Sequence, residues 1–211
     1  MTAPAASPTL PTTWSLGTLG PAGTDHERAA REYARTRLDG RHSIHLLTDF
    51  AAAGDFLAGD GLRLLVVNSA HQDVDLLVTR DWRRVAMVDF FALPTMPLAL
   101  VKRADVARPT SIALMPATRG YLDLADFSRV DYVSAKPIAL RHTLAGRSDA
   151  AIVSMPGYHE HRDELDLVAT IGPVVCCWLV FGRPQRVAHR LPPLPVIGAD
   201  PDPGDRAEGP R

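Results

Sequence analysis

The stretch Ser15-Leu-Gly-Thr-Leu-Gly-Pro-Ala-Gly-Thr-Asp-His-Glu-Arg-Ala-Ala30 decides the fold. It predicts a buried strand that runs through a Gly-Pro-x-Gly-Thr turn directly into a helix. Thr24 and Glu27 have the Thr-x-x-Glu spacing of a capping box, and the helix then places small and apolar side chains on one face, namely Ala29, Ala30, Tyr33 and Ala34. A glycine turn that leaves backbone N–H groups free at a helix start can hold an anion. The stretch therefore predicts a small acidic ligand at the carboxyl end of a strand.

Strand-like and helix-like segments alternate from this stretch outward. Strands are expected at 14–19, 44–47, 62–67, 85–93, 97–102, 111–115, 130–133, 150–153, 167–171 and 176–181. Helices are expected at 25–38, from Asp49 to 57, at 118–127, from Pro137 to about Gly146, and at 156–162. This alternation predicts an α/β fold with a mainly parallel sheet covered on both faces.

Ligands of such sheets bind beyond the carboxyl ends of the strands. Four segments place small polar groups there: Gly20–Thr24, Asn68–Gln72, Met115–Arg119 and Ser134–Lys136.

Composition limits the classes of function. The 211 residues include 23 basic and 24 acidic side chains, so the chain has no basic field for nucleic acid. No apolar run of about 18 residues and no signal peptide is found, which predicts a cytoplasmic protein that does not bind membranes. Cys176 and Cys177 are adjacent and point to opposite faces of a strand, so neither a mutual disulfide nor a zinc cluster is expected. No metal or other cofactor is expected.

The two ends of the chain differ in composition from its middle. Residues 1–13 are rich in Ala, Pro and Thr, and residues 191–211 are dense in proline without an apolar period. Both ends are expected to be disordered, which leaves one folded unit over residues 14–190.

Several motifs, taken in order, resemble those of prephenate dehydratases. Leu19–Ala30 resembles their Gly-Pro-x-Gly-Thr-x-x-Glu-x-Ala-Ala opening, and Val66–Ser69 resembles their Ile-Glu-Asn-Ser strand end. Ser134 with Asp149–Ser154 resembles their Ser-Thr-x-x-Ala-Ala and Ala-Ala-Ile-Ala-Ser segments, and Cys176–Gly182 lies where their catalytic domain ends. The likeness covers about residues 15–183.

The chain is most similar to a divergent branch, the bacilysin-type prephenate decarboxylases of antibiotic pathways, which close on Ser-Trp-Ser-Leu-Phe-Gly. Here that run becomes Cys177-Trp-Leu-Val-Phe-Gly182. The resemblance implies two α/β lobes like those of a type II periplasmic binding protein, with the ligand cleft between them and no ACT domain. It places one lobe at about 14–91 plus 151–183 and the other at about 92–150, and it implies a homodimer.

The chain departs from the dehydratases at their Thr-Arg-Phe signature, where registering on Gly182 places Cys176, Cys177 and Trp178. Prephenate has a ring carboxylate, a pyruvyl carboxylate and an allylic hydroxyl, and dehydration needs an acid at the hydroxyl. The resemblance therefore implies a small dicarboxylate substrate that loses CO2 without becoming aromatic. Two alternatives stay open: a dehydratase or isomerase of a related shikimate-derived acid, and a non-catalytic binder of an aromatic amino or keto acid.

The residues of the glycine turn and the strand ends are candidates for ligand binding, each with a simpler alternative. Gly23 and Thr24 either touch the ligand or only cap a helix. Asn68 and Ser69 either touch the ligand or only satisfy a turn. His71 is the candidate proton donor because imidazole titrates near neutrality, although a lone loop histidine is often a bystander.

The resemblance adds the remaining candidates. Arg119 and Lys136 replace relatives' polar residues and supply charges that could hold a carboxylate; Arg119 is otherwise a surface residue. Ser134 lies in the Ser-Thr-x-x-Ala pattern. Cys177 is either a reactive thiol or a small buried side chain, and Trp178 is either a cleft wall or a core residue.

Overall fold

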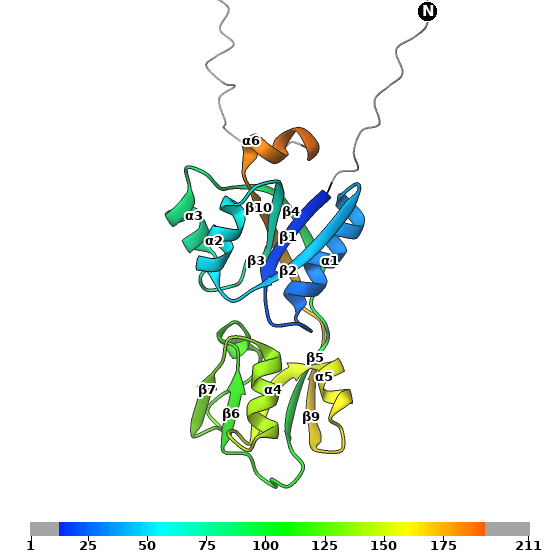
Figure 1. Cartoon of the computed structure of the whole chain (residues 1–211). Helices are drawn as coiled ribbons and strands as arrows, with labels where there is room; N and C mark the ends of the chain where they lie inside the picture. Colours follow the sequence, from blue (N-terminus) through cyan, green and yellow to red (C-terminus); the bar gives the residue numbers. More distant parts are fainter. Residues whose placement is uncertain (1–12, 193–211) are drawn as a thin grey trace, which may run out of the picture.

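A computed structural model describes residues 13–192, folded into two lobes that each contain a five-stranded sheet (Figure 1). The expected N-terminal arm and proline-rich tail lie outside the described residues, apart from their innermost positions. Of these, Thr13 begins the first strand, and Leu191 is 7% exposed and packs against the core of the first lobe. No described helix is long and apolar enough to cross a membrane.

The first lobe is built from the two ends of the described chain. Its sheet has the order β2-β1-β3-β10-β4, in which β1, β2 and β3 are parallel and β10 runs antiparallel to both of its neighbours. The elements are β1 (Thr13–Leu19), α1 (Asp25–Arg37), β2 (Arg41–Leu47), α2 (Phe50–Ala58), β3 (Leu62–Asn68), α3 (Asp75–Asp81), β4 (Ala86–Pro94), β10 (Val175–Gly182), α6 (Pro184–Val187) and the 3-10 turn η2 (Ala188–Arg190).

The second lobe is formed by the middle of the chain. Its sheet has the order β7-β6-β8-β5-β9, with β6 parallel to β7 and β8, and β5 antiparallel to β8 and β9. The elements are β5 (Leu98–Arg103), β6 (Ser111–Leu114), the 3-10 helix η1 (Pro116–Tyr121), β7 (Arg129–Tyr132), α4 (Lys136–Leu144), β8 (Ala150–Ser154), α5 (Met155–Glu160) and β9 (Leu165–Ile171).

The core of the first lobe explains the apolar run of β3. All four side chains of Leu64–Val67 are fully buried. Leu64 and Val66 belong to the cluster under α1, whereas Leu65 and Val67 belong to the cluster under α2 and α3, because successive side chains of a strand face opposite sides. At Gly17 on β1, a Cβ would lie 2.8 Å from the ring of Phe56, so glycine lets α2 approach this closely.

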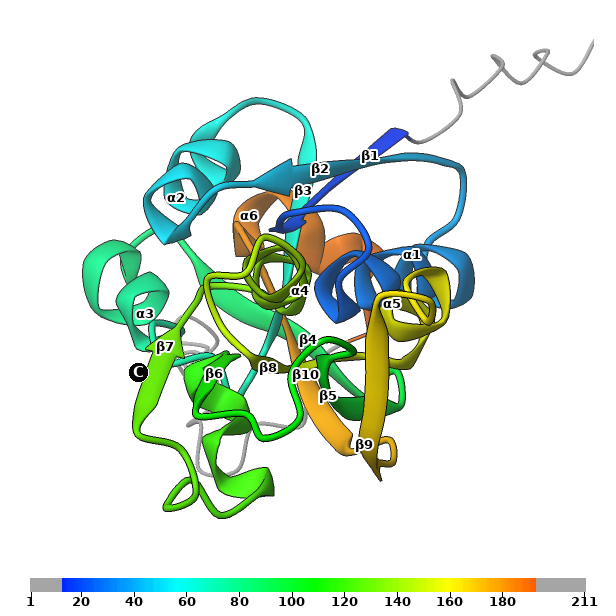
Figure 2. The ribbon, with the colours of Figure 1, turned by 90° about the horizontal axis from the view of Figure 1, so that it is seen from below.

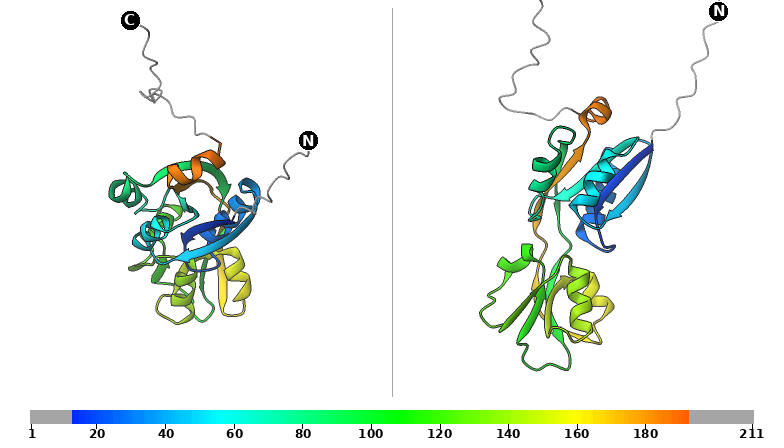
Figure 3. Two further views of the ribbon diagram at one scale, coloured as in Figure 1. Left: turned by 45° about the horizontal axis from the view of Figure 1, so that its top comes forward. Right: turned by 60° about the vertical axis from the view of Figure 1, so that its left-hand side comes forward.

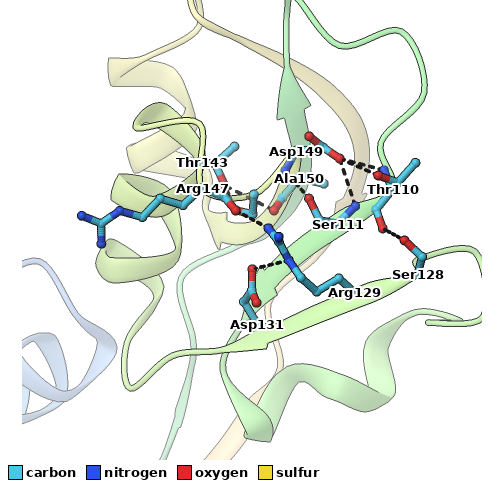
Figure 4. A network of polar contacts seen from close by, with 10 residues as sticks. Thr110, Ser111, Ser128, Arg129, Asp131, Thr143, Arg147, Asp149 and Ala150 are labelled. Atoms are coloured by element: carbon cyan, nitrogen blue, oxygen red, sulfur yellow. Dashed lines mark hydrogen bonds and ion pairs between the residues drawn. The ribbon is translucent and has the colours of Figure 1, made fainter.

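A carboxylate joins the amino-terminal ends of β6 and β8 in the second lobe (Figure 4). Asp149 Oδ2 accepts hydrogen bonds from the backbone N–H of Thr110 at 2.9 Å and of Ser111 at 3.0 Å, and from Thr110 Oγ1 at 3.1 Å. The backbone N–H of Asp149 in turn donates to Ser111 Oγ at 2.9 Å. These bonds, led by that of Thr110 N–H, lower the pKa of Asp149.

Two connecting segments, 95–97 and 172–174, run side by side between the lobes as a hinge (Figure 3). Thr95 N–H donates to the Val174 carbonyl at 2.8 Å, and Val174 N–H donates to Thr95 Oγ1 at 3.1 Å. Helix α1 also contacts the hinge, where Arg28 Nη1 donates to the Pro94 carbonyl at 2.6 Å. The hinge is therefore paired across its two segments and buttressed by α1.

The structure differs from the sequence expectation in the strand directions of both sheets and in several helices. Both sheets are mixed rather than mainly parallel, because β10 and β5 run against their neighbours. In place of the helix expected at 118–127, the 3-10 helix η1 ends at Tyr121, and Asp123 accepts the Ala125 N–H at 2.9 Å in the turn that follows. The helices α3 and α6 have no counterpart among the expected helices.

The lobe boundary also differs. β8 and β9, which the resemblance placed in the first lobe, belong to the second sheet, so the chain returns to the first lobe only at Val175. A strand that is apolar on both faces, such as β8, fits the interior of either sheet. Its composition therefore does not say which sheet it joins.

Candidate functional site

A cavity of about 380 Å³ lies between the lobes. The first lobe contributes the carboxyl ends of β1 and β3, and the second contributes η1 and the start of α4. Because β10 is antiparallel, its amino-terminal half lies at the same edge of the sheet, which brings Cys176 and Trp178 into the wall. The cavity is therefore bordered jointly by the early glycine turn and by the late tryptophan segment.

The glycine turn has the expected capping geometry. Glu27 N–H donates to Thr24 Oγ1 at 3.3 Å, and the Glu27 carboxylate reaches back to the N–H of Gly23, at 2.8 Å, rather than to that of Thr24. Gly23 has a φ of 77°, which favours glycine. The N–H of Gly23 is therefore bonded within the turn, and this residue is exposed and lies outside the cavity wall, whereas Thr24 lines the cavity.

An ion pair joins the two lobes across the cavity. Lys136 Nζ, at the start of α4, lies 2.7 Å from Asp25 Oδ2, at the start of α1. The other carboxylate oxygen, Asp25 Oδ1, accepts the N–H of Met96 in the hinge at 2.7 Å. The side chains of Lys136 and Asp25 are only 11% and 6% exposed. Figure 2 is seen from the side of the second lobe, so that α4 lies in front of the lobe that carries α1.

His26 forms part of the same wall. Its Nε2 accepts the backbone N–H of Asn68 at 3.3 Å, which places the ring proton on Nδ1. The ring lies edge-on to Trp178, with centroids 5.2 Å apart. Burial, followed by the nearby His71 and Lys136, lowers the pKa of His26 to about 3, so this imidazole is neutral at pH 7.

His71 lies in the wall beside His26. Its Nδ1 accepts the Asp73 backbone N–H at 3.2 Å, so the neutral ring carries its proton on Nε2. The ring is edge-on to Phe50, with centroids 4.9 Å apart, and is 6.0 Å from the His26 ring. Burial lowers the pKa of His71, and the Asp73 carboxylate partly opposes that shift.

The fold is found in known proteins, but its sequence is distant from theirs. Neither a protein-family profile nor a curated protein matches the chain. Prephenate dehydratase from Staphylococcus aureus is 18% identical with a TM-score of 0.52, over 81% of this chain and 66% of that enzyme, which is just under two thirds of its length. An ABC transporter protein from Parabacteroides distasonis is 14% identical with a TM-score of 0.53, over 85% and 68%.

A third solved structure is an extracytoplasmic solute receptor of Bordetella pertussis that binds pyroglutamic acid. It is 16% identical with a TM-score of 0.52, over 86% of this chain and 73% of the receptor. The chain has the two-lobed fold of prephenate dehydratase and of periplasmic binding proteins. At these identities the likeness concerns the fold alone.

The two candidate residues at the end of β3, Asn68 and Ser69, differ in their position relative to the cavity. Asn68 lines the cavity and its Oδ1 accepts the Ala70 N–H at 2.8 Å. Ser69 is exposed, lies outside the wall, and donates its N–H to the Cys177 carbonyl at 3.0 Å. Ser69 therefore serves the turn and the pairing of β3 with β10.

The side chains of β10 alternate between the cavity and the opposite face. Trp178 is fully buried, lines the cavity, and donates its Nε1–H to the Leu93 carbonyl at 3.2 Å, so it is both core and wall. Cys177, proposed as a site residue, is exposed and faces away, and Cys176 takes its place in the wall. Both thiols are free.

The two candidate cationic residues, Arg119 and Lys136, also differ in their position relative to the cavity. Arg119 is exposed on η1 and lies outside the wall of the cavity. Lys136 lines the cavity, and Ser134, exposed at the end of β7, lines it too. Asp25 and His26 were missed by the sequence reasoning, although the first two residues of a helix that follows a glycine turn are placed to face a ligand.

The charge of the wall is unusual for an anion site. Of the described lining residues, Lys136 alone carries a positive charge at pH 7, whereas Asp25, Asp49 and Asp73 are acids and both histidines are neutral. Trp178, Phe50 and Cys176 make much of the rest apolar. Between residues 13 and 192, no group of three or more His, Cys, Asp or Glu side chains is arranged to hold a metal ion.

Proposed function

We propose that the chain is a lyase that removes CO2 from prephenate, or from a close cyclohexadienyl acid, without making the ring aromatic. The observation that carries this proposal is the charge of the cleft, which offers one lysine to a substrate with two carboxylates. The motifs that resemble those of prephenate dehydratases support the choice of substrate. The shared fold is compatible with it but does not select the reaction.

The pyruvyl carboxylate binds Lys136. An ammonium group has three donors, one of which Asp25 accepts in the described structure, and Lys136 can give these donors to a carboxylate of the substrate instead. The ring carboxylate is then left among apolar and acidic side chains. Because CO2 is neutral, its departure relieves the repulsion between this carboxylate and the wall, and the energy of binding at Lys136 offsets that repulsion before the reaction.

The electrons left by CO2 move through a ring alkene, and a ring carbon accepts a proton. His71 is the proposed donor. In the free protein burial lowers the pKa of His71, but a dianionic substrate beside the ring raises the pKa of the imidazole, so the substrate itself favours the protonated form. The apolar wall at Cys176 and Trp178 keeps acids away from the ring hydroxyl, which therefore stays on the product.

Incubation of the protein with prephenate tests the proposal. The expected products, analysed by mass spectrometry and nuclear magnetic resonance, are CO2 and a hydroxylated dihydro keto acid. Phenylpyruvate as the product would show dehydration and would contradict the proposal. If the protein converts a related shikimate-derived acid but not prephenate, the result would instead favour an isomerase or dehydratase that acts on that acid.

A non-catalytic binder is the second candidate, because the lobes already meet through the Asp25–Lys136 ion pair and because a solute receptor has the same fold. Two-lobed binders need only a cleft and a hinge, both of which are present. Prephenate recovered unchanged after tight, saturable binding would favour this candidate over the lyase.

A further inference from the structure

The start of α4 has the character of an anion site. No side chain caps this nine-residue helix, whose N-cap is Ala135, and its first residue is Lys136. The partial positive charge of a helix N-terminus repels a lysine, unless an anion lies against both. In the described structure that anion is the carboxylate of Asp25, from the other lobe.

Asp25 does not depend on Lys136 for its place. It is the first residue of α1, where the helix dipole favours a carboxylate, and its Oδ1 is held by Met96 N–H. Only Oδ2 contacts Lys136. Asp25 can therefore release Lys136 and remain a stable, hydrogen-bonded anion at the hinge.

We propose that Asp25 competes with the ligand's carboxylate for Lys136: it pairs with Lys136 when no ligand is bound, thereby joins the two lobes, and is displaced when a carboxylic acid binds. The inference rests on the proposed binding of a carboxylate at Lys136. It makes Asp25 a specificity-determining residue, since weak carboxylates fail to displace it and only ligands with further contacts to both lobes succeed.

The test measures binding of phenylpyruvate, which has the pyruvyl carboxylate but no ring carboxylate to lose, by isothermal titration calorimetry. Asp25→Asn keeps an acceptor for Met96 N–H and removes the competing charge. We expect its dissociation constant to fall about tenfold, a coupling of ordinary size. Glu27→Gln is the matched control, because it removes one acid from the same helical turn but its carboxylate pairs with Arg31 and Gly23. Its affinity is expected to equal that of the unaltered protein.

A second substitution of Asp25 guards against a folding defect, and a Lys136→Gln background tests whether the gain in affinity depends on Lys136. Asp25→Ser replaces Asp25→Asn if the latter does not fold, as judged by circular dichroism, because serine is tolerated at a helix start. In a Lys136→Gln background, the gain from Asp25→Asn is expected to vanish. An equal gain in both backgrounds, an equal gain from Glu27→Gln, or no gain at all would overturn the proposal.

The separation of the lobes gives an independent measurement. Without ligand, small-angle scattering is expected to show a larger radius of gyration for Asp25→Asn than for Glu27→Gln, and equal radii would contradict the role of Asp25 in joining the lobes. Phenylpyruvate is not a substrate of the proposed reaction. Tighter binding by Asp25→Asn without any decarboxylation of prephenate would therefore sink the proposed function alone, whereas decarboxylation with unchanged affinity would sink this inference alone.

Discussion

Lys136 contributes the single positive charge that the described side chains place in the cleft, and its replacement tests the carboxylate anchor. We expect Lys136→Gln to weaken binding of prephenate by about 1.5–3 kcal/mol, the range for a lost charge-assisted hydrogen bond. Arg119→Gln is the matched control, because it removes an equal charge from a residue outside the wall. Equal losses in both variants, measured by calorimetry, would point to a general effect of net charge.

His71 is the residue that the proposed reaction needs for its proton. His71→Gln is expected to lower turnover of prephenate by roughly 100-fold while leaving its binding nearly unchanged. The exposed His159 serves as the control, and His159→Gln should keep the normal rate. A near-normal rate for His71→Gln in a steady-state assay would remove the histidine from the reaction.

The pH dependence of the same assay has a defined sign. Burial places the pKa of His71 in the free protein below its ordinary value, and kcat/KM reports groups of the free protein. A donor must be protonated, so kcat/KM is expected to rise as the pH falls toward that lowered pKa. A rate that rises with pH would instead indicate a base.

At the scale of single elements, the Thr24 cap of α1 can be separated from ligand binding. Thr24→Ala removes the acceptor of the Glu27 N–H and is expected to lower the free energy of unfolding by about 1 kcal/mol. Thr24→Ser keeps the hydroxyl and should unfold like the unaltered chain. Chemical denaturation followed by circular dichroism measures both, and an unchanged stability of Thr24→Ala would show that the turn does not need its cap.

The hydrogen bonds that the Asp149 carboxylate accepts in the second lobe make the free energy of unfolding depend on pH. This carboxylate has a lowered pKa in the folded state, so its contribution is present above the ordinary carboxyl pKa and is lost as the pH falls through the lowered value. Asp149→Asn is expected to lower the free energy of unfolding by about 1–3 kcal/mol at neutral pH. The difference should shrink in acid, and the exposed Asp163 gives the matched control, Asp163→Asn.

Sequence patterns predicted the helices and strands well where the deciding interactions join residues that are close in sequence. The capping box at Thr24 and Glu27, the Asp49 cap of α2 and the apolar run of β3 are all present. The alternation of strand side chains also separates Cys177 from Trp178, and it could have placed Cys176 in the wall from the sequence alone. The prediction of a helix at 118–127 was wrong for a reason that is also local, because the side chain of Asp123 accepts the Ala125 N–H in a turn.

At the scale of the whole molecule, the two-lobed fold could be anticipated only through the resemblance, and its lobe boundary could not. Which sheet β8 joins is decided by pairing with β5 and β6, and neither partner is specified by the composition of β8. The same holds for the Asp25–Lys136 pair, whose members are 111 residues apart. Contacts between lobes depend on the hinge geometry, which no short pattern encodes.

Ligand binding is expected to change the molecule in a defined region. Hydrogen exchange with and without prephenate should slow at the starts of α1 and α4 and at the hinge around Thr95 and Val174. The backbone amides of Thr110 and Ser111, which bond Asp149 outside the cavity wall, should exchange equally in both states. Uniform slowing throughout both lobes would indicate global stabilisation rather than closure of the cleft.

The position of β10 has a consequence for synthesis on the ribosome. Strand β10, which lies between β3 and β4, is translated after every residue of the second lobe. The amino-terminal part of the first lobe therefore emerges with β3 and β4 lacking the strand that pairs with both. Exposed strand edges recruit foreign strands. Nascent chains stalled before Val175 should therefore aggregate or engage chaperones, while chains released after Gly182 mature on their own.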